Sequence, residues 1–310
     1  MSAVATFADA VRLLGGTPLG SGSDAVELTG TSTAANPRPG TVSFMTSWAP
    51  GSADVVHGHP RTLWIVPEGA DLPAGTTNAV RVGRPRLGFA LVVRDLLADE
   101  VEPVVAPTAY VDPEAQVHPT ASVGHFAVLE AGVEIGPYTR VDHHVVLKTG
   151  VRIGAHCRVG AHTSIGGPGF GFETDEDGTP VRIGHRGGVV VGDHVEIGHH
   201  VSIAQGTIEP TRLADHVKVD DCVFLAHNVQ VGEGSFVIAG AEVSGSVTIG
   251  RNVWIAPEVT VLNKVTIADD ALVGIGAVVV KDVPANTVVA GVPAKPRGER
   301  YPGRTPTDGP

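Results

Sequence analysis

The sequence predicts a mainly β protein, in which a parallel β-helix of hexapeptide repeats follows a small α/β domain. Two observations lead to this fold class. Aliphatic residues recur at every sixth position in 26 hexads, whereas residues 1–100 lack this period. A period of six matches neither the stripe of an α-helix nor the alternation of a simple strand, and it is the repeat of a parallel β-helix. The aliphatic positions run from Val105 to Ile165, from Val191 to Ile203 and from Leu213 to Val279.

Each hexad predicts one short strand and one turn, with its aliphatic residue pointing into a narrow core. Three hexads close a triangular coil, so residues 18 apart in the sequence stack one rung apart, roughly 4.8 Å. The hexads then form about eight to nine coils, a prism on the order of 40 Å long. Its backbone ladder leaves unpaired edges at the two ends, which need covering.

The first hundred residues contain the signals of a small α/β domain. A helical face of Phe7, Ala10, Val11 and Leu14 ends at Gly15-Gly16. Alternating or continuous apolar runs predict strands, and a second helix is predicted nearer the repeats. The expected strands are Val26–Leu28, Thr41–Phe44 and Leu63–Val66, and the second helix is Arg86–Leu97. We therefore expect a domain at 1–102, the β-helix at 103–296 with a loop at 166–190, and a disordered tail at 297–310.

The composition of the chain indicates which kinds of binding partner are unfavourable. The formal net charge is -11 and the pI is near 5.6, which argues against nucleic acid and anionic membranes. Cys157 and Cys222 lie in different hexads and are interpreted as buried thiols in a reducing cytoplasm. No basic region precedes an apolar stretch at the N-terminus, and no apolar run is long enough to span a membrane.

Two interruptions of the repeat carry the functional signals. The first, Gly166 to Val190, contains the aromatic pair Phe170 and Phe172 between glycines, followed by the basic residues Arg182, His185 and Arg186. A long loop on a solenoid usually shapes a ligand site, and exposed aromatic side chains are costly without a partner. The arginines are candidate contacts for a diphosphate.

The second interruption, Ala204 to Arg212, delays the next aliphatic position by four residues and is followed by His227. His227 stands two residues past a core position, so its side chain can face a surface groove. Gly245 lies 18 residues later, one rung away. A histidine base beside a backbone N–H is the minimum equipment for acyl transfer, because the base takes a proton and the N–H stabilises the oxyanion. Asp220 and Asn228 are candidate sugar contacts by position only.

The other histidines allow a metal interpretation. Pairs such as His194 and His199, or His156 and His162, are five and six residues apart, and three histidines can bind Zn²⁺ between chains. Most of them occupy outward turn positions, as do His118, His125, His194 and His216. We therefore expect no metal and no bound cofactor.

Three stretches, Thr41–Met45, Gly169–Phe172 and Leu225–Val229, carry a resemblance to a known family, and the loop continues into a further match at Gly188–Gly198. These stretches resemble UDP-3-O-acylglucosamine N-acyltransferase, the third enzyme of lipid A assembly. The resemblance extends over almost all of residues 4–296.

The resemblance implies a left-handed β-helix, a cytoplasmic homotrimer and active sites between neighbouring subunits. It implies that His227 is the general base, that Gly245 supplies the oxyanion N–H, and that a uracil stacks on Phe44 in the first domain. Trp48 is a candidate second aromatic face. The acyl donor is then an acyl carrier protein or CoA, used as a co-substrate.

The sequence also departs from this family. The family's C-terminal helical extension is replaced by a segment, Lys281–Lys295, that resembles the end of CoA-dependent acetyltransferases. Lys264 stands where the family can carry a second histidine, and Ala204–Gly206 replaces an Asp-Arg-Gly. A CoA-dependent acetyltransferase of another nucleotide sugar is thus the main alternative. A non-catalytic scaffold and a trimer like a γ-type carbonic anhydrase are further ones.

Overall fold

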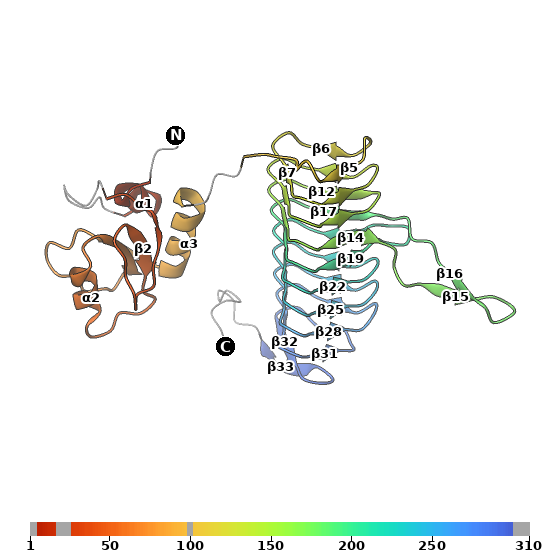
Figure 1. Ribbon diagram of the computed structural model, residues 1–310. Helices are drawn as coiled ribbons and strands as arrows, with labels where there is room; N and C mark the ends of the chain where they lie inside the picture. The colour runs from red at the N-terminus through yellow and green to blue at the C-terminus, as the bar shows by residue number, and fades with distance from the viewer. Residues whose placement is uncertain (1–4, 17–25, 98–101, 300–310) are drawn as a thin grey trace. The chain divides into compact units, whose positions relative to one another are not determined.

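The computed structural model describes residues 5–16, 26–97 and 102–299, and the chain divides into two compact units between Val101 and Glu102. The first unit contains a parallel four-stranded sheet in the order β1-β2-β3-β4 (Figure 1). Its elements are α1 (Phe7–Leu13), β1 (Gly30–Thr31), β2 (Thr41–Phe44), α2 (Ser52–Gly58), β3 (Thr62–Pro67), β4 (Ala79–Val82) and α3 (Pro85–Leu96). The strands predicted at 41–44 and 63–66 and both predicted helices are confirmed.

The start of α1 is fixed by a capping box. The Thr6 hydroxyl accepts from the Asp9 N–H, and the Asp9 carboxylate accepts from the Thr6 N–H at 2.8 Å. The predicted strand at Val26–Leu28 is wrong, because within it only Glu27 forms a bridge, to Thr6. The sheet buries one face with α1 and α3, around Phe7, Leu63 and Val92, and its other face around Trp64.

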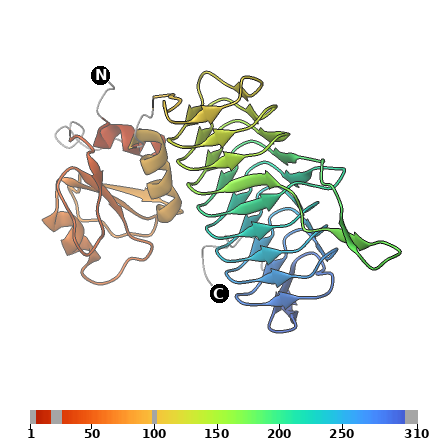
Figure 2. The ribbon, with the colours of Figure 1, turned by 45° about the vertical axis from the view of Figure 1, so that its right-hand side comes forward.

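The second unit is a left-handed parallel β-helix whose strands stack into three sheets (Figures 1 and 2). The first sheet contains β7 (Ser122–Val123), β10 (Arg140–Val141), β13 (Arg158–Val159), β18 (Glu196–Ile197), β21 (Lys218–Val219), β24 (Phe236–Val237), β27 (Trp254–Ile255), β30 (Leu272–Val273), β32 (Thr287–Ala290) and the antiparallel β33 (Lys295–Glu299). The second contains β5 (Tyr110–Val111), β8 (Val128–Leu129), β11 (Val146–Leu147), β14 (Ser164–Gly167), β19 (Ser202–Ala204), β22 (Phe224–Leu225), β25 (Glu242–Val243), β28 (Thr260–Val261) and β31 (Val278–Val279). The third contains β6 (Gln116–Val117), β9 (Glu134–Ile135), β12 (Val151–Ile153), β17 (Val189–Val191), β20 (Thr211–Leu213), β23 (Gln230–Val231), β26 (Thr248–Ile249) and β29 (Thr266–Ile267).

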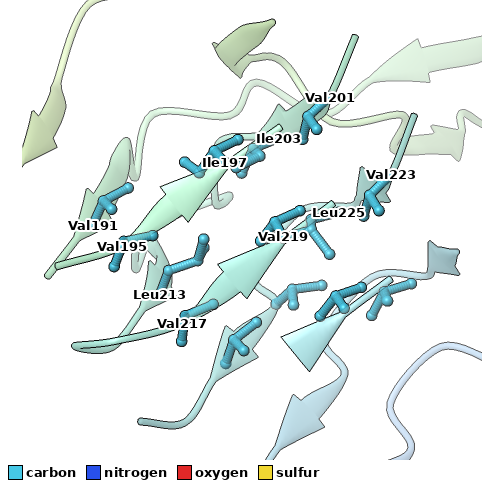
Figure 3. Close-up of a cluster of buried hydrophobic side chains, with 14 of the residues drawn as sticks. Val191, Val195, Ile197, Val201, Ile203, Leu213, Val217, Val219, Val223 and Leu225 are labelled. Atoms are coloured by element: carbon cyan, nitrogen blue, oxygen red, sulfur yellow. The ribbon is translucent and has the colours of Figure 1, made fainter. Parts of the chain in front are cut away.

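The predicted aliphatic positions form the core of the prism. Figure 3 shows that aliphatic residues at equivalent positions of neighbouring coils lie next to each other, as Val191 does with Leu213 and Ile203 with Leu225. These side chains are buried, and residues on successive rungs pair directly in the ladder. Core and ladder therefore form together, as the repeat predicts. The exceptions belong to the first coil, where Val105 is exposed and Val111 and Val117 are only partly buried.

Two further expectations need correction. Cys157 is buried, but Cys222 is exposed because it occupies a corner between the first and second sheets. Residues 297–299 belong to β33, so the chain is ordered beyond 296, whereas the rest of the predicted tail, 300–310, lies outside the described residues. In the described ranges, no helix combines the length and apolar character needed to cross a bilayer.

Candidate active site

Both interruptions of the repeat and His227 lie at one corner of the prism, between the second and third sheets. Residues 168–188 leave after β14 and return at β17, residues 205–210 connect β19 to β20, and His227 follows β22. Because β14, β19, β22 and β25 are successive neighbours in the second sheet, these features occupy successive rungs. We call this edge the insertion corner; it comprises residues 168–188, 205–210, 226–229 and 244–247.

The imidazole of His227 lies directly against Gly245 on the next rung. A β-carbon at position 245 would lie 2.6 Å from Nε2 of His227 and 2.7 Å from Cε1, so only glycine fits there without displacing the ring. The stacking expected from the 18-residue spacing is thus present. Within the described residues, the N–H of Gly245 donates no hydrogen bond, whereas the corresponding corner N–H of Arg251 donates to Asp269 at 2.8 Å. Gly245 therefore presents a free donor beside the imidazole.

Asn228 fixes which nitrogen of His227 carries the proton. Its Oδ1 accepts from the N–H and hydroxyl of Thr207 at 3.1 and 2.9 Å, and its Nδ2 donates to the Glu209 carbonyl at 3.0 Å. These bonds orient the amide so that Oδ1 faces Nδ1 of His227 at 3.1 Å. Nδ1 then donates, and the lone pair of Nε2 is available at the Gly245 side. The Asn228 amide, which the sequence predicts to contact a sugar, makes all of these hydrogen bonds within the protein.

The second interruption braces the first. Gly188 and Gly206 form an antiparallel bridge, with the Gly206 N–H donating to Gly188 at 3.1 Å and the Gly187 N–H donating to Gly206 at 2.8 Å. The Arg186 N–H donates to the Thr207 carbonyl at 3.0 Å. Because Thr207 also bonds Asn228, one continuous set of contacts joins the loop to the histidine.

The loop between β14 and β17 ends in a hairpin, β15 (Phe172–Thr174) and β16 (Pro180–Arg182), which projects away from the coils in both views (Figures 1 and 2). Phe170 is 84% exposed and packs edge-on against Phe172, with ring centroids 5.0 Å apart. The guanidinium of Arg182 lies 4.5 Å above the Phe172 ring and donates to the Gly169 carbonyl at 3.3 Å. Arg182 thus supports the aromatic pair, rather than standing free for a diphosphate.

His185, named above only as part of the loop, packs against His227 with ring centroids 5.1 Å apart. Sequence reasoning missed this contact because nothing in the repeat fixes where the returning chain passes. Asp220, in contrast, lies at the corner between the first and second sheets, where it accepts from the N–H groups of Asp221 and Ala239. Within one chain it is not brought to the insertion corner.

The first unit holds a separate cavity of about 630 Å³, lined by Phe44. Its aromatic neighbour there is Phe89 of α3, with ring centroids 4.9 Å apart. Trp48 was the expected partner, but it packs with Trp64 in the cluster on the other face of the sheet. Ser43 is also a lining residue, and its Oγ is buried without a hydrogen-bond partner among the described residues.

The outward histidines stack on one another instead of converging. One ladder contains His144, His162 and His200, and another contains His156, His194 and His216. Ring centroids in these ladders are 4.8 to 5.0 Å apart with nearly parallel planes. Stacked rings point their nitrogens sideways, so neighbours in a ladder do not share a metal. Throughout the described ranges, no group of three or more potential ligands is arranged to hold a metal ion.

Solved structures show the same fold. UDP-N-acetylglucosamine O-acyltransferase from Moraxella catarrhalis has a TM-score of 0.59 at 27% identity, covering 64% of this chain and 76% of that one. The enzyme from Acinetobacter baumannii has a TM-score of 0.58 at 24% identity, covering 63% and 74%.

Curated relatives extend the likeness to sequence, although no family model matches the chain. UDP-3-O-acylglucosamine N-acyltransferase from Coxiella burnetii is 39% identical over 189 residues, 54% of this chain and 55% of the relative. The match to the Campylobacter curvus enzyme covers 43% of its length at 34% identity, so the chain spans about half the length of these relatives. The Pseudomonas syringae enzyme is 36% identical over 239 residues, 71% of this chain and 67% of the relative. On this match, the chain belongs to the UDP-3-O-acylglucosamine N-acyltransferase family.

Proposed function

We propose that the protein is an N-acyltransferase that moves an acyl group from a thioester to the amine of a nucleotide-linked amino sugar. The observation that carries the proposal is the contact of the His227 imidazole with Gly245, which places a base beside a free N–H. The names of the curated relatives supply the acceptor class, a UDP-linked acylglucosamine.

The geometry supports a direct transfer. Nε2 of His227 removes a proton from the sugar amine as its nitrogen attacks the thioester carbon. The N–H of Gly245 stabilises the negative oxygen of the tetrahedral intermediate. The carbon–sulfur bond then breaks, the imidazolium returns the proton to the sulfur, and an amide and a free thiol are formed. The Asn228 contact keeps the proton of neutral His227 on Nδ1 throughout.

The cavity of the first unit suits the base of the nucleotide. The Phe44–Phe89 pair offers an aromatic wall, and stacking on such rings accepts any base. We assign the uracil to this cavity.

The remaining predicted contacts follow from position. Phe170 and Phe172 are proposed to contact the acceptor, because an exposed aromatic pair held by a cation–π contact is organised for a ligand. Asp220 takes part only if it comes from a neighbouring subunit of the expected homotrimer.

The donor separates the two leading functions. An acyl carrier protein fits the family, whereas the acetyltransferase-like segment Lys281–Lys295 favours CoA. Incubation of the protein and a UDP-amino sugar with acetyl-CoA or with 3-hydroxyacyl carrier protein distinguishes them by thiol release and product mass. Release from the carrier protein alone supports the lipid A-type reaction, and release from acetyl-CoA alone supports the alternative. Absence of thiol release with either donor contradicts acyl transfer and favours a non-catalytic scaffold.

A further inference from the structure

His185 is a buried histidine that the proposed mechanism does not use. It is 8% exposed, and its ring meets that of His227 at 5.1 Å with the planes inclined by 60°. Its Nδ1 lies 3.0 Å from the carbonyl oxygen of Ile183. A neutral imidazole donates from Nδ1 to that carbonyl, which fixes the ring within the returning leg of the loop.

The glycines of the aromatic loop make room for this ring. A β-carbon at Gly169 would lie 2.5 Å from Nε2 of His185 and 2.9 Å from Cβ of His227. A β-carbon at Gly171 would lie 3.2 Å from Cε1 of His185. The stretch that presents Phe170 is therefore wrapped closely around the contact between the two histidines, and its glycines have a packing reason.

We propose that His185 is a positioning residue, which holds the His227 ring against Gly245; the inference rests on the proposed acyl transfer. Asn228 holds His227 by one hydrogen bond at Nδ1, and one bond leaves the ring free to tilt. The ring of His185 supplies a second contact, from the loop. Because a misplacement of about 1 Å can cost roughly 100-fold in rate, this contact affects turnover.

Three substitutions separate the ring contact with His227 from the hydrogen bond to the Ile183 carbonyl. His185→Ala removes both contacts. His185→Phe keeps a ring against His227, and His185→Asn keeps a donor near the Ile183 carbonyl. We expect His185→Ala to lower kcat roughly 10- to 100-fold, with the KM for the nucleotide sugar changed by less than about 3-fold. His185→Phe restores most of kcat, and His185→Asn does not. His216→Ala, at another corner, is the matched control and keeps the wild-type rate.

A second measurement does not depend on turnover. Diethyl pyrocarbonate modifies neutral imidazoles, and mass spectrometry of the His227 peptide gives the rate at that residue. We expect faster modification of His227 in the Ala and Asn variants and the wild-type rate in the Phe variant. Equal rates in all four proteins, or restoration of kcat by Asn but not Phe, would overturn the proposal. Failure of the proposed function is a different result: the wild-type protein then releases no thiol from either donor, while the modification rates still decide the role of His185.

Discussion

The Oδ1 atom of Asn228 lies 3.1 Å from Nδ1 of His227 and also accepts two hydrogen bonds from Thr207. One amide therefore joins the proposed base to the four-residue insertion, which in turn braces the loop 168–188. The insertion thus has a role beyond lengthening a turn. It sets the orientation of the Asn228 amide, and that amide orients the imidazole of His227.

Loss of Asn228 is predicted to reduce turnover more than substrate binding. Asn228→Ala removes the acceptor at Nδ1, so the imidazole loses its fixed tautomer, and kcat falls roughly 10- to 100-fold. Steady-state kinetics check this, with Asn252→Ala as control, because Asn252 is also a corner asparagine with positive φ, but its amide bonds Asp270, away from the insertion corner. An unchanged kcat with a raised KM would instead mark Asn228 as the sugar contact predicted from sequence.

Gly245→Ala is predicted to abolish activity without unfolding the β-helix. The added methyl group would meet Nε2 of His227 at 2.6 Å and push the base from the oxyanion donor, which costs about 100-fold or more in kcat. Gly167→Ala is the matched control, since a β-carbon there meets no atom within 4 Å. Near-wild-type activity of Gly245→Ala would show that this close contact is not needed for turnover.

Phe44→Ala is predicted to weaken binding of the nucleotide sugar. Stacking on an aromatic ring contributes about 1–3 kcal/mol per base, so the KM rises roughly 5- to 100-fold while kcat changes little. Trp48→Ala is the comparison, because Trp48 packs in the opposite cluster. If Trp48→Ala raises the KM and Phe44→Ala does not, the base is bound on the other face of the sheet.

The ion pair between Lys148 and Glu130, which follow strands β11 and β8 of the second sheet, predicts a pH dependence of stability. A hydrogen bond from Lys148 at 2.7 Å, together with bonds from Thr149, lowers the pKa of Glu130 below its ordinary value. Because the pKa of Glu130 is lower in the folded than in the unfolded protein, its ionised carboxylate stabilises the fold at pH values above the unfolded pKa, about 4.3. This stabilisation is lost as the pH falls through the lower pKa of the folded protein. Thermal melting of Glu130→Gln should differ from wild type at neutral pH and converge with it in acid. A difference that persists in acid would contradict the charge origin.

Much of the fold follows from the period of six. The phase of the repeat identifies inward residues such as Leu225, and the 18-residue spacing stacks His227 on Gly245 before any coordinates are known. That stacking could be predicted because every rung repeats the same backbone path.

The rest depends on segments without a period. The contact of His185 with His227 follows from the bridge between Gly188 and Gly206, which sequence spacing does not encode. In the first unit, the chain turns after β2 and carries Trp48 to the face opposite Phe44, so nearness in sequence was misleading. Cys222 is exposed because a corner residue three positions before Leu225 faces outward, although its residue type is usually buried.

The most direct measurement is the rate of acyl transfer to a UDP-linked 3-O-acylglucosamine by His227→Ala, beside the wild-type protein and with the better donor. Removal of a positioned general base costs roughly 100- to 10,000-fold, so the variant should fold as a β-helix by circular dichroism and release almost no thiol. A folded variant that acylates the sugar amine at the wild-type rate would contradict the assignment of His227 as the base.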